Sequence, residues 1–185
     1  MHRSIKFLSI IILSFFIYNC AGSKPARTSG SKPKWTIEET ATKRGKFYFK
    51  SAVFNGNDLD YMKRNQANAG AIQTILEKIQ TSARLELDNS LVGTLGGAKG
   101  KFGSTVVNAL SQAKFSSLTL EESYWETVGK STDTYDWYGW YSVETKEIKA
   151  ARERAWQTAE EQSLSTMDED ARNVALEAKS RFLKD

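Results

Sequence analysis

The stretch TYDWYGWYSV, residues 134–143, decides the fold of this chain. Its aromatic and β-branched residues predict a strand. Residues 115–128 before it alternate imperfectly between apolar and polar side chains, which also indicates a strand. Because only the turn-rich residues 129–133 separate the two, we expect an antiparallel hairpin.

The predicted hairpin is aromatic on both faces. One face carries Tyr135, Trp137, Tyr141 and Val143, and the other carries Tyr138 and Trp140. The first face can pack on a helix. For the second, three explanations stay open: contact with another subunit, which we favour, a layer of C-terminal helices, and a ligand groove. We expect Trp125 to join Tyr138 and Trp140 across the hairpin. The candidate partner-binding residues are therefore Trp125, Trp137, Tyr138, Trp140 and Tyr141.

A further strand and a long helix are predicted before the hairpin. Residues 46–54, KFYFKSAVF, predict the strand, and residues 55–58 form a turn. The helix, of about 30 residues, is indicated by apolar residues at steps of three and four. These are Leu59, Met62, Ala69, Ile72, Ile75, Leu76, Ile79, Ala83 and Leu87. The chain of 185 residues therefore predicts one compact α+β domain, in which a small three-stranded antiparallel sheet packs on one long helix.

The remaining segments predict a loop and three further helices. Residues 89–104 are rich in glycine and indicate a loop before a short helix through Val106 and Leu110. A Walker phosphate loop is excluded, because Gly100-Lys101 is followed by Phe102. Residues 144–162 and 166–182 predict a C-terminal helical extension. These helices cover the sheet of their own subunit or bundle between subunits.

The N-terminal residues predict a signal peptide. Arg3 and Lys6 form a basic start, the mostly apolar residues 7–18 follow, and Cys20 comes next. An apolar run of this length is too short for a hydrocarbon core that needs roughly 20 helical residues. Residues 17–20, IYNC, resemble a loose lipobox of bacterial lipoproteins, as spirochaetes use. We therefore expect cleavage after residue 19 and acylation of Cys20. A non-lipidated leader and a buried free thiol are the alternatives.

Residues 20–34 predict a flexible basic tether. They contain both prolines of the chain, and Lys24, Arg27, Lys32 and Lys34 are their charged residues. These cations either touch anionic lipid headgroups or simply keep a spacer soluble. The expected division of the chain is therefore a leader over 1–19, the tether over 20–34, the α+β domain over 35–143 and the helices over 144–185.

Composition argues against an enzyme. The single His is residue 2 and the single Cys is the lipidation candidate, so the mature chain has no His and no free thiol for a triad or a zinc site. The acids near the hairpin, Glu121, Glu122, Asp133 and Asp136, show no spacing that predicts a common cleft. A net charge of +4 without an arginine cluster argues against nucleic-acid binding. We expect no metal and no cofactor beyond the diacylglycerol and N-acyl lipid on Cys20.

Several short motifs resemble the LPP-twenty family of bacterial outer-membrane lipoproteins. They are Pro33-Lys34-Trp35, Ala83-Arg84-Leu85-Glu86-Leu87, Tyr124-Trp125 and Trp140-Tyr141-Ser142-Val143. The resemblance implies a dodecin-like unit of three strands around one helix that assembles into rings or discs, as flagellar basal-disc lipoproteins do. It also implies an outer-membrane location.

The function that we expect is that of a non-enzymatic, lipid-anchored envelope lipoprotein. It would form homo-oligomers or support an envelope or flagellar assembly, because an open sheet edge and face favour association. The alternative is a monomeric surface module that binds host matrix or glycan through the aromatic hairpin face.

Overall fold

The computed structural model describes residues 27–63, 67–91, 97–163, 165 and 169–183. The predicted signal peptide and Cys20 lie outside these residues. The described chain is an α+β protein with one antiparallel sheet in the order β1-β2-β4-β3. Its strands are β1 (Thr40–Lys43), β2 (Lys46–Gly56), β3 (Thr119–Thr127) and β4 (Tyr135–Glu144). The predicted hairpin, β3–β4, is confirmed, and β4 lies between β3 and β2.

The prediction of three strands is wrong, because β1 adds a fourth at the edge beside β2. Lys43 pairs with Lys46, so Arg44 and Gly45 form a two-residue turn. Both turn residues have positive φ, 53° and 73°, as hairpin turns of this length require. Arginine is uncommon in that backbone region, and Asn or Asp at this position is the usual sequence signal of such a turn. The hairpin was therefore not predicted.

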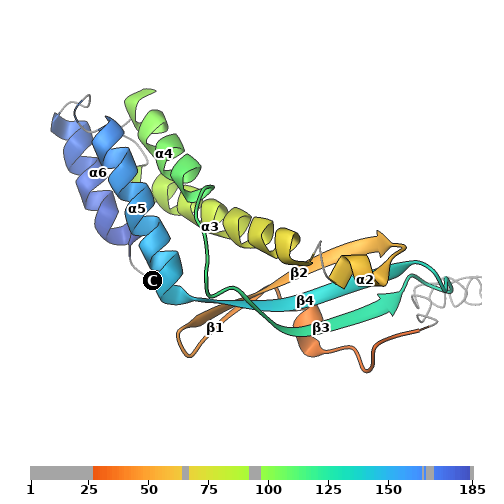
Figure 1. Ribbon diagram of the computed structural model, residues 1–185. Helices are drawn as coiled ribbons and strands as arrows, with labels where there is room; N and C mark the ends of the chain where they lie inside the picture. The colour runs from red at the N-terminus through yellow and green to blue at the C-terminus, as the bar shows by residue number, and fades with distance from the viewer. Residues whose placement is uncertain (1–26, 64–66, 92–96, 164, 166–168, 184–185) are drawn as a thin grey trace, which may run out of the picture.

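The α-helices form a layer on one face of the sheet and a bundle beyond its end, and a short 3-10 helix lies on the opposite face (Figure 1). They are η2 (Lys34–Thr36, 3-10), α2 (Leu59–Tyr61), α3 (Ala67–Leu91), α4 (Gly97–Leu110), α5 (Thr145–Ser163) and α6 (Glu169–Phe182). The first half of α3 crosses the sheet, while α4, α5 and α6 gather around its second half. The two predicted C-terminal helices are thus present, but they pack on α3 and α4 rather than cover the sheet.

The apolar residues on α3 explain its position. Ala71, Ile75, Ile79, Ala83 and Leu87, each four residues apart, are buried in one core with residues from β2, β4, α4, α5 and α6. Ile72, which we assigned to this stripe, is 45% exposed. Of the predicted helix, the structure describes Leu59–Tyr61 (α2) and Ala67–Leu91 (α3) as α-helical, and residues 64–66 between them lie outside the described residues.

The glycine-rich stretch is partly helical, which corrects the predicted loop. Within it, α3 extends to Leu91, and α4 begins at Gly97. Phe102 anchors α4 because its buried ring packs edge-on against Trp156 of α5, with ring centroids 5.0 Å apart.

Candidate functional site

The face of the sheet opposite α3 carries a second, separate aromatic cluster. Its buried members are Trp35, Tyr124, Tyr138 and Trp140, with Ala41, Tyr48 and Ala52 packed against them. The predicted alternation along β4 is confirmed, since Trp137 and Tyr141 belong to the core under α3 while Tyr138 and Trp140 face the other way.

This second face is covered by the N-terminal segment, residues 27–36, of the same chain. Trp35 lies against Trp140 with ring centroids 5.9 Å apart and ring planes 22° apart. Its indole Nε1 donates a hydrogen bond to Oε2 of Glu122, 2.6 Å away. Lys50 reinforces the cover because its Nζ donates to the carbonyl oxygen of Thr36 at 2.9 Å. The cover seen here is therefore the chain's own N-terminal segment and not the C-terminal helices, while contact with another subunit stays a prediction.

The N-terminal segment is also bonded to the edge strand β3. Ser29 N donates to the carbonyl oxygen of Trp125 at 3.0 Å, and Thr127 N donates to that of Arg27 at 2.9 Å. Nζ of Lys32 lies 2.5 Å from Oε1 of Glu126. These bonds pair the segment with the outer edge of β3 as a short additional strand does. Residues 27–34, expected to belong to the tether, therefore form part of the fold.

The rings of this cluster stay neutral well above physiological pH. Burial, and then the neighbouring carboxylate of Glu126, raises the pKa of Tyr124 to about 12. Burial first, and the charges of Asp136 and Glu126 next, raise that of Tyr138 to about 12. Under α3, burial raises the pKa of Tyr141 to about 12 as well. These three tyrosines therefore offer no phenolate near neutral pH.

Four of the five candidate partner-binding side chains lie inside the chain's own structure. Trp137, Tyr138, Trp140 and Tyr141 are all buried. They are thus divided between two faces, and in this conformation none of the four forms a surface that a partner could reach.

The fifth candidate, Trp125, lies on the face opposite to the one predicted. It pairs with Trp137, and its ring meets Tyr135 edge-on with centroids 5.6 Å apart. The reason is a register shift between Leu120 and Glu122, since one extra residue in a strand reverses the faces that follow it. Tyr124 therefore takes the place beside Tyr138 that we assigned to Trp125.

The acidic residues near the hairpin have separate partners. Glu121 accepts hydrogen bonds from Ser142 and Lys46, and these two contacts lower the pKa of its carboxyl. Glu122 accepts from Trp35, and Asp136 accepts from the backbone of Asn55. Across the described ranges, no three His, Cys, Asp or Glu residues come together as a metal-binding group.

A cavity of about 560 Å³ lies between the β1–β2 hairpin, α3 and α5. Its wall includes apolar Phe47, Ile79 and Ile148 and polar Ser82, Glu86 and Arg152. The Arg152 side chain is only 10% exposed, and its Nη2 donates to Oε1 of Glu86 at 2.9 Å and to Oγ of Ser82 at 3.0 Å. Its Nη1 donates to the carbonyl oxygen of Phe182 at 3.1 Å. Arg152 of α5 thus links α3 to the end of α6.

Sequence reasoning missed Trp35, Tyr48 and Arg152. The position of Tyr48 was predictable, because strand alternation places it on the same face as Ala52. Arg152 and Trp156 each follow a buried alanine of α5 and continue the three- and four-residue spacing of its buried face, so this spacing could have identified both. For Trp35 no local pattern indicated a position on the sheet.

Comparison with protein-family models, with curated proteins and with solved structures finds no match. Within the described part of the chain, no helix combines the length and the apolar character needed to cross a membrane.

Proposed function

We propose that this chain is a non-enzymatic lipoprotein, anchored to the outer membrane through acylated Cys20, that supports an assembly of the cell envelope. The observation that carries the proposal is the leader itself: a basic start, an apolar run and the single Cys of the chain. Two or three acyl chains hold a protein on a bilayer far longer than one does, because each buried methylene contributes about 0.8 kcal/mol.

The structure supports this proposal through the length of the connection. Arg27 is already bonded to β3, so only residues 21–26 separate the folded domain from Cys20. An extended chain advances at most about 3.6 Å per residue, so the seven steps from Cys20 to Arg27 span at most about 25 Å. An acylated Cys20 would therefore keep the domain close to the membrane surface.

Fatty-acid labelling followed by membrane fractionation tests the anchor. We expect the wild-type chain to incorporate the label and to sediment with outer membranes, and Cys20→Ala to do neither. Ser23→Ala, a change just beyond the site, is the matched control and should behave like wild type. Label retained in Cys20→Ala would refute the anchoring proposal.

Self-association is the second part of the proposal, and the free edge of the sheet supports it. The strand order places β1 at one lateral edge of the sheet, whereas the N-terminal segment covers the opposite edge at β3. An edge strand offers unpaired backbone groups to a second copy or to another envelope protein. This arrangement also fits the oligomeric role implied by the resemblance to LPP-twenty proteins.

Light scattering on the detergent-solubilised full chain tests self-association. We expect a protein mass that is a multiple of the monomer's. A monomer at all concentrations would contradict self-association and leave the anchor proposal intact.

A further inference from the structure

At the ends of the strands next to the β3–β4 turn, several residues suit contact with a lipid surface. Hydrogen bonds and strand register define this end of the sheet. Arg27 is bonded to Thr127, Thr127 pairs with Tyr135, and Tyr135 pairs with Gly56. These four residues therefore form a row across the sheet, next to the β3–β4 turn. The described chain begins in this row, so a segment leading from Cys20 enters the domain here (Figure 1).

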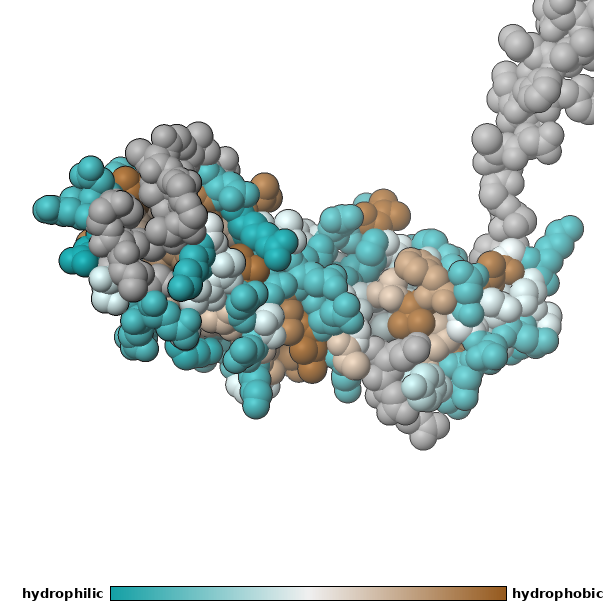
Figure 2. Space-filling model, turned by 90° about the horizontal axis from the view of Figure 1, so that it is seen from above, coloured by the Kyte–Doolittle hydropathy of each residue, from teal (hydrophilic) through white to brown (hydrophobic). Residues whose placement is uncertain are grey.

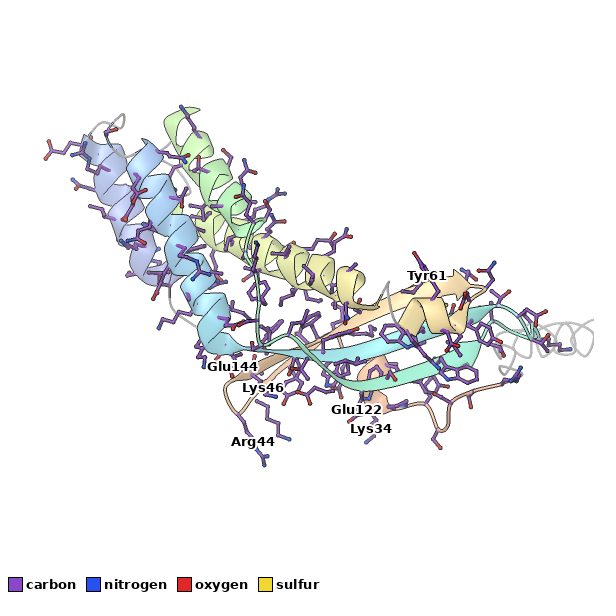
Figure 3. All side chains as sticks on the ribbon, in the orientation of Figure 1. Lys34, Arg44, Lys46, Tyr61, Glu122 and Glu144 are labelled. Carbon is purple, nitrogen blue, oxygen red and sulfur yellow. The ribbon has the colours of Figure 1, made fainter. Side chains whose placement is uncertain are left out.

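Two exposed aromatic side chains lie at the same end. Phe54 comes two residues before Gly56 in β2 and is 59% exposed, and its ring touches Tyr138 only edge-on. Tyr61 belongs to α2, which begins directly after this row, and is 51% exposed. Figure 3 shows Tyr61 at the end of the sheet away from Arg44 and the β1–β2 turn.

These are the only aromatic residues among the large exposed hydrophobic side chains of the described residues; the others are Ile37, Ile72, Leu85, Leu120 and Leu176. Elsewhere the surface seen from above is mostly hydrophilic, with hydrophobic residues in separate patches (Figure 2). Aromatic side chains favour the interface between lipid headgroups and water, because their rings are apolar and their edges or hydroxyl groups tolerate a polar environment.

We propose that this end of the sheet rests on the membrane, with Phe54 and Tyr61 inserted at the level of the lipid headgroups. The inference rests on the proposed function, because acylated Cys20 must hold the domain at the bilayer. The two side chains lie on opposite faces of the sheet, since Phe54 touches Tyr138 while Met62, next to Tyr61, belongs to the core under α3. A bilayer that meets both must therefore meet the sheet end-on.

This orientation points the helical bundle away from the membrane. α3 begins near Tyr61, and Leu85 lies 18 residues after Ala67, which corresponds to about 27 Å along the helix. The bundle of α4, α5 and α6 surrounds this distant part of α3 (Figure 1). The bundle and the β1 edge thus remain accessible to other envelope proteins.

Charge is not the driving force for this contact. Exposed cations at this end, Arg27, Lys63 and Lys130, are accompanied by as many exposed acids, Asp58, Asp60 and Asp133. The acyl chains and the two aromatic side chains supply the attraction instead. We therefore expect the same contact on zwitterionic and anionic membranes.

Spin labelling of the acylated full chain tests the orientation. Since acylation blocks the thiol of Cys20, a cysteine introduced at one position carries the only label. We choose Phe54→Cys and Tyr61→Cys. Leu85→Cys and Leu176→Cys are the matched controls, because Leu85 and Leu176 are 59% and 46% exposed, close to the values of the two aromatic residues. Each variant is placed in vesicles of phosphatidylcholine alone and of phosphatidylcholine with phosphatidylglycerol.

We expect labels at positions 54 and 61 to be severalfold less accessible to a water-soluble relaxing agent than labels at 85 and 176, in both kinds of vesicle. Equal accessibility at all four positions on acylated, vesicle-bound protein would overturn the orientation and leave the anchor proposal intact. Protection that requires phosphatidylglycerol would also overturn the proposal as stated, because it would indicate a charge-driven contact. Protection that appears only when the density of protein on the vesicles is raised would indicate contact with a second copy instead. A chain that is neither acylated nor bound to vesicles would refute both proposals.

Discussion

Gly139 shows how strongly a single residue constrains this sheet. A Cβ atom there would lie 2.3 Å from Cη2 of Trp137 and 2.6 Å from Cε2 of Tyr141, and both of those rings are buried under α3. The glycine therefore permits two large rings to meet above one backbone position. It is the position without a side chain among the aromatic residues Trp137 to Tyr141, where close packing tolerates no additional methyl group.

We predict that Gly139→Ala lowers the free energy of unfolding by about 1–3 kcal/mol, because the two rings must move. The control is Gly100→Ala within α4, where a new Cβ would meet nothing within 4 Å. That substitution should raise the free energy of unfolding by about 0.5–1 kcal/mol, because alanine favours a helix interior. Urea unfolding measures both, and equal effects of the two substitutions would contradict the packing assigned to Gly139.

We predict that the folded chain loses stability in alkaline solution, because Tyr124 and Tyr138 are buried. An ordinary tyrosine has a pKa of 10.0, whereas these two have a pKa of about 12 in the folded chain. Their contribution to stability is therefore complete below pH 10 and falls as the pH rises toward 12, because the unfolded chain releases these protons first.

Tyrosinate absorbance of the native chain and of the chain in guanidinium checks this prediction. The absorbance titration of the native chain should contain a component that appears well above pH 10.0, and Tyr124→Phe should reduce the amplitude of this component. Native and denatured titrations that coincide would show that these rings are not buried as described.

At the level of elements, the N-terminal segment covers the face of the sheet opposite α3. Its Trp35 is 8% exposed and stacks on Trp140, while Ile37, two residues later, is 79% exposed. We predict that Trp35→Ala costs about 3 kcal/mol of unfolding free energy. Ile37→Ala should change it by less than about 0.5 kcal/mol. Similar values for the two substitutions in urea unfolding would show that the segment does not pack on the sheet.

Arg152 connects three elements, α3, α5 and α6. Its removal leaves the carboxylate of Glu86, which belongs to α3, without its nearest cation. We predict that Arg152→Ala costs about 3 kcal/mol, whereas the exposed Arg154→Ala costs less than about 0.5 kcal/mol. The double substitution Arg152→Met with Glu86→Leu should recover most of the loss, because no unpaired charge then remains. Failure of that recovery would contradict the charge-based account.

Regular periodicity made several elements predictable. The α3 stripe and the alternation along β4 each repeat for long enough to identify the element, and the aromatic and β-branched residues of β2 identify a strand. Interruptions account for the errors: Arg44 conceals a hairpin turn, the shift after Leu120 exchanges the faces of β3, and the glycines of α4 resemble a loop. The docking of Trp35 was not predictable, because its partners lie far away in the sequence.

At the scale of the whole molecule, a single core joins the sheet to its helices. The residues we divided into a domain over 35–143 and an extension from 144 share that core, because α5 continues directly from β4 and packs on α4. The N-terminal segment covers the opposite face and starts at one end of the sheet. If Cys20 is acylated, at most about 25 Å of chain therefore separates the anchor from the folded domain.

The mass of the N-terminal peptide of the membrane-bound chain tests this account most directly. We predict a peptide that begins at Cys20 and carries a thioether-linked diacylglycerol and an amide-linked fatty acid. A peptide that begins at Met1, or one with an unmodified thiol at Cys20, would contradict the account.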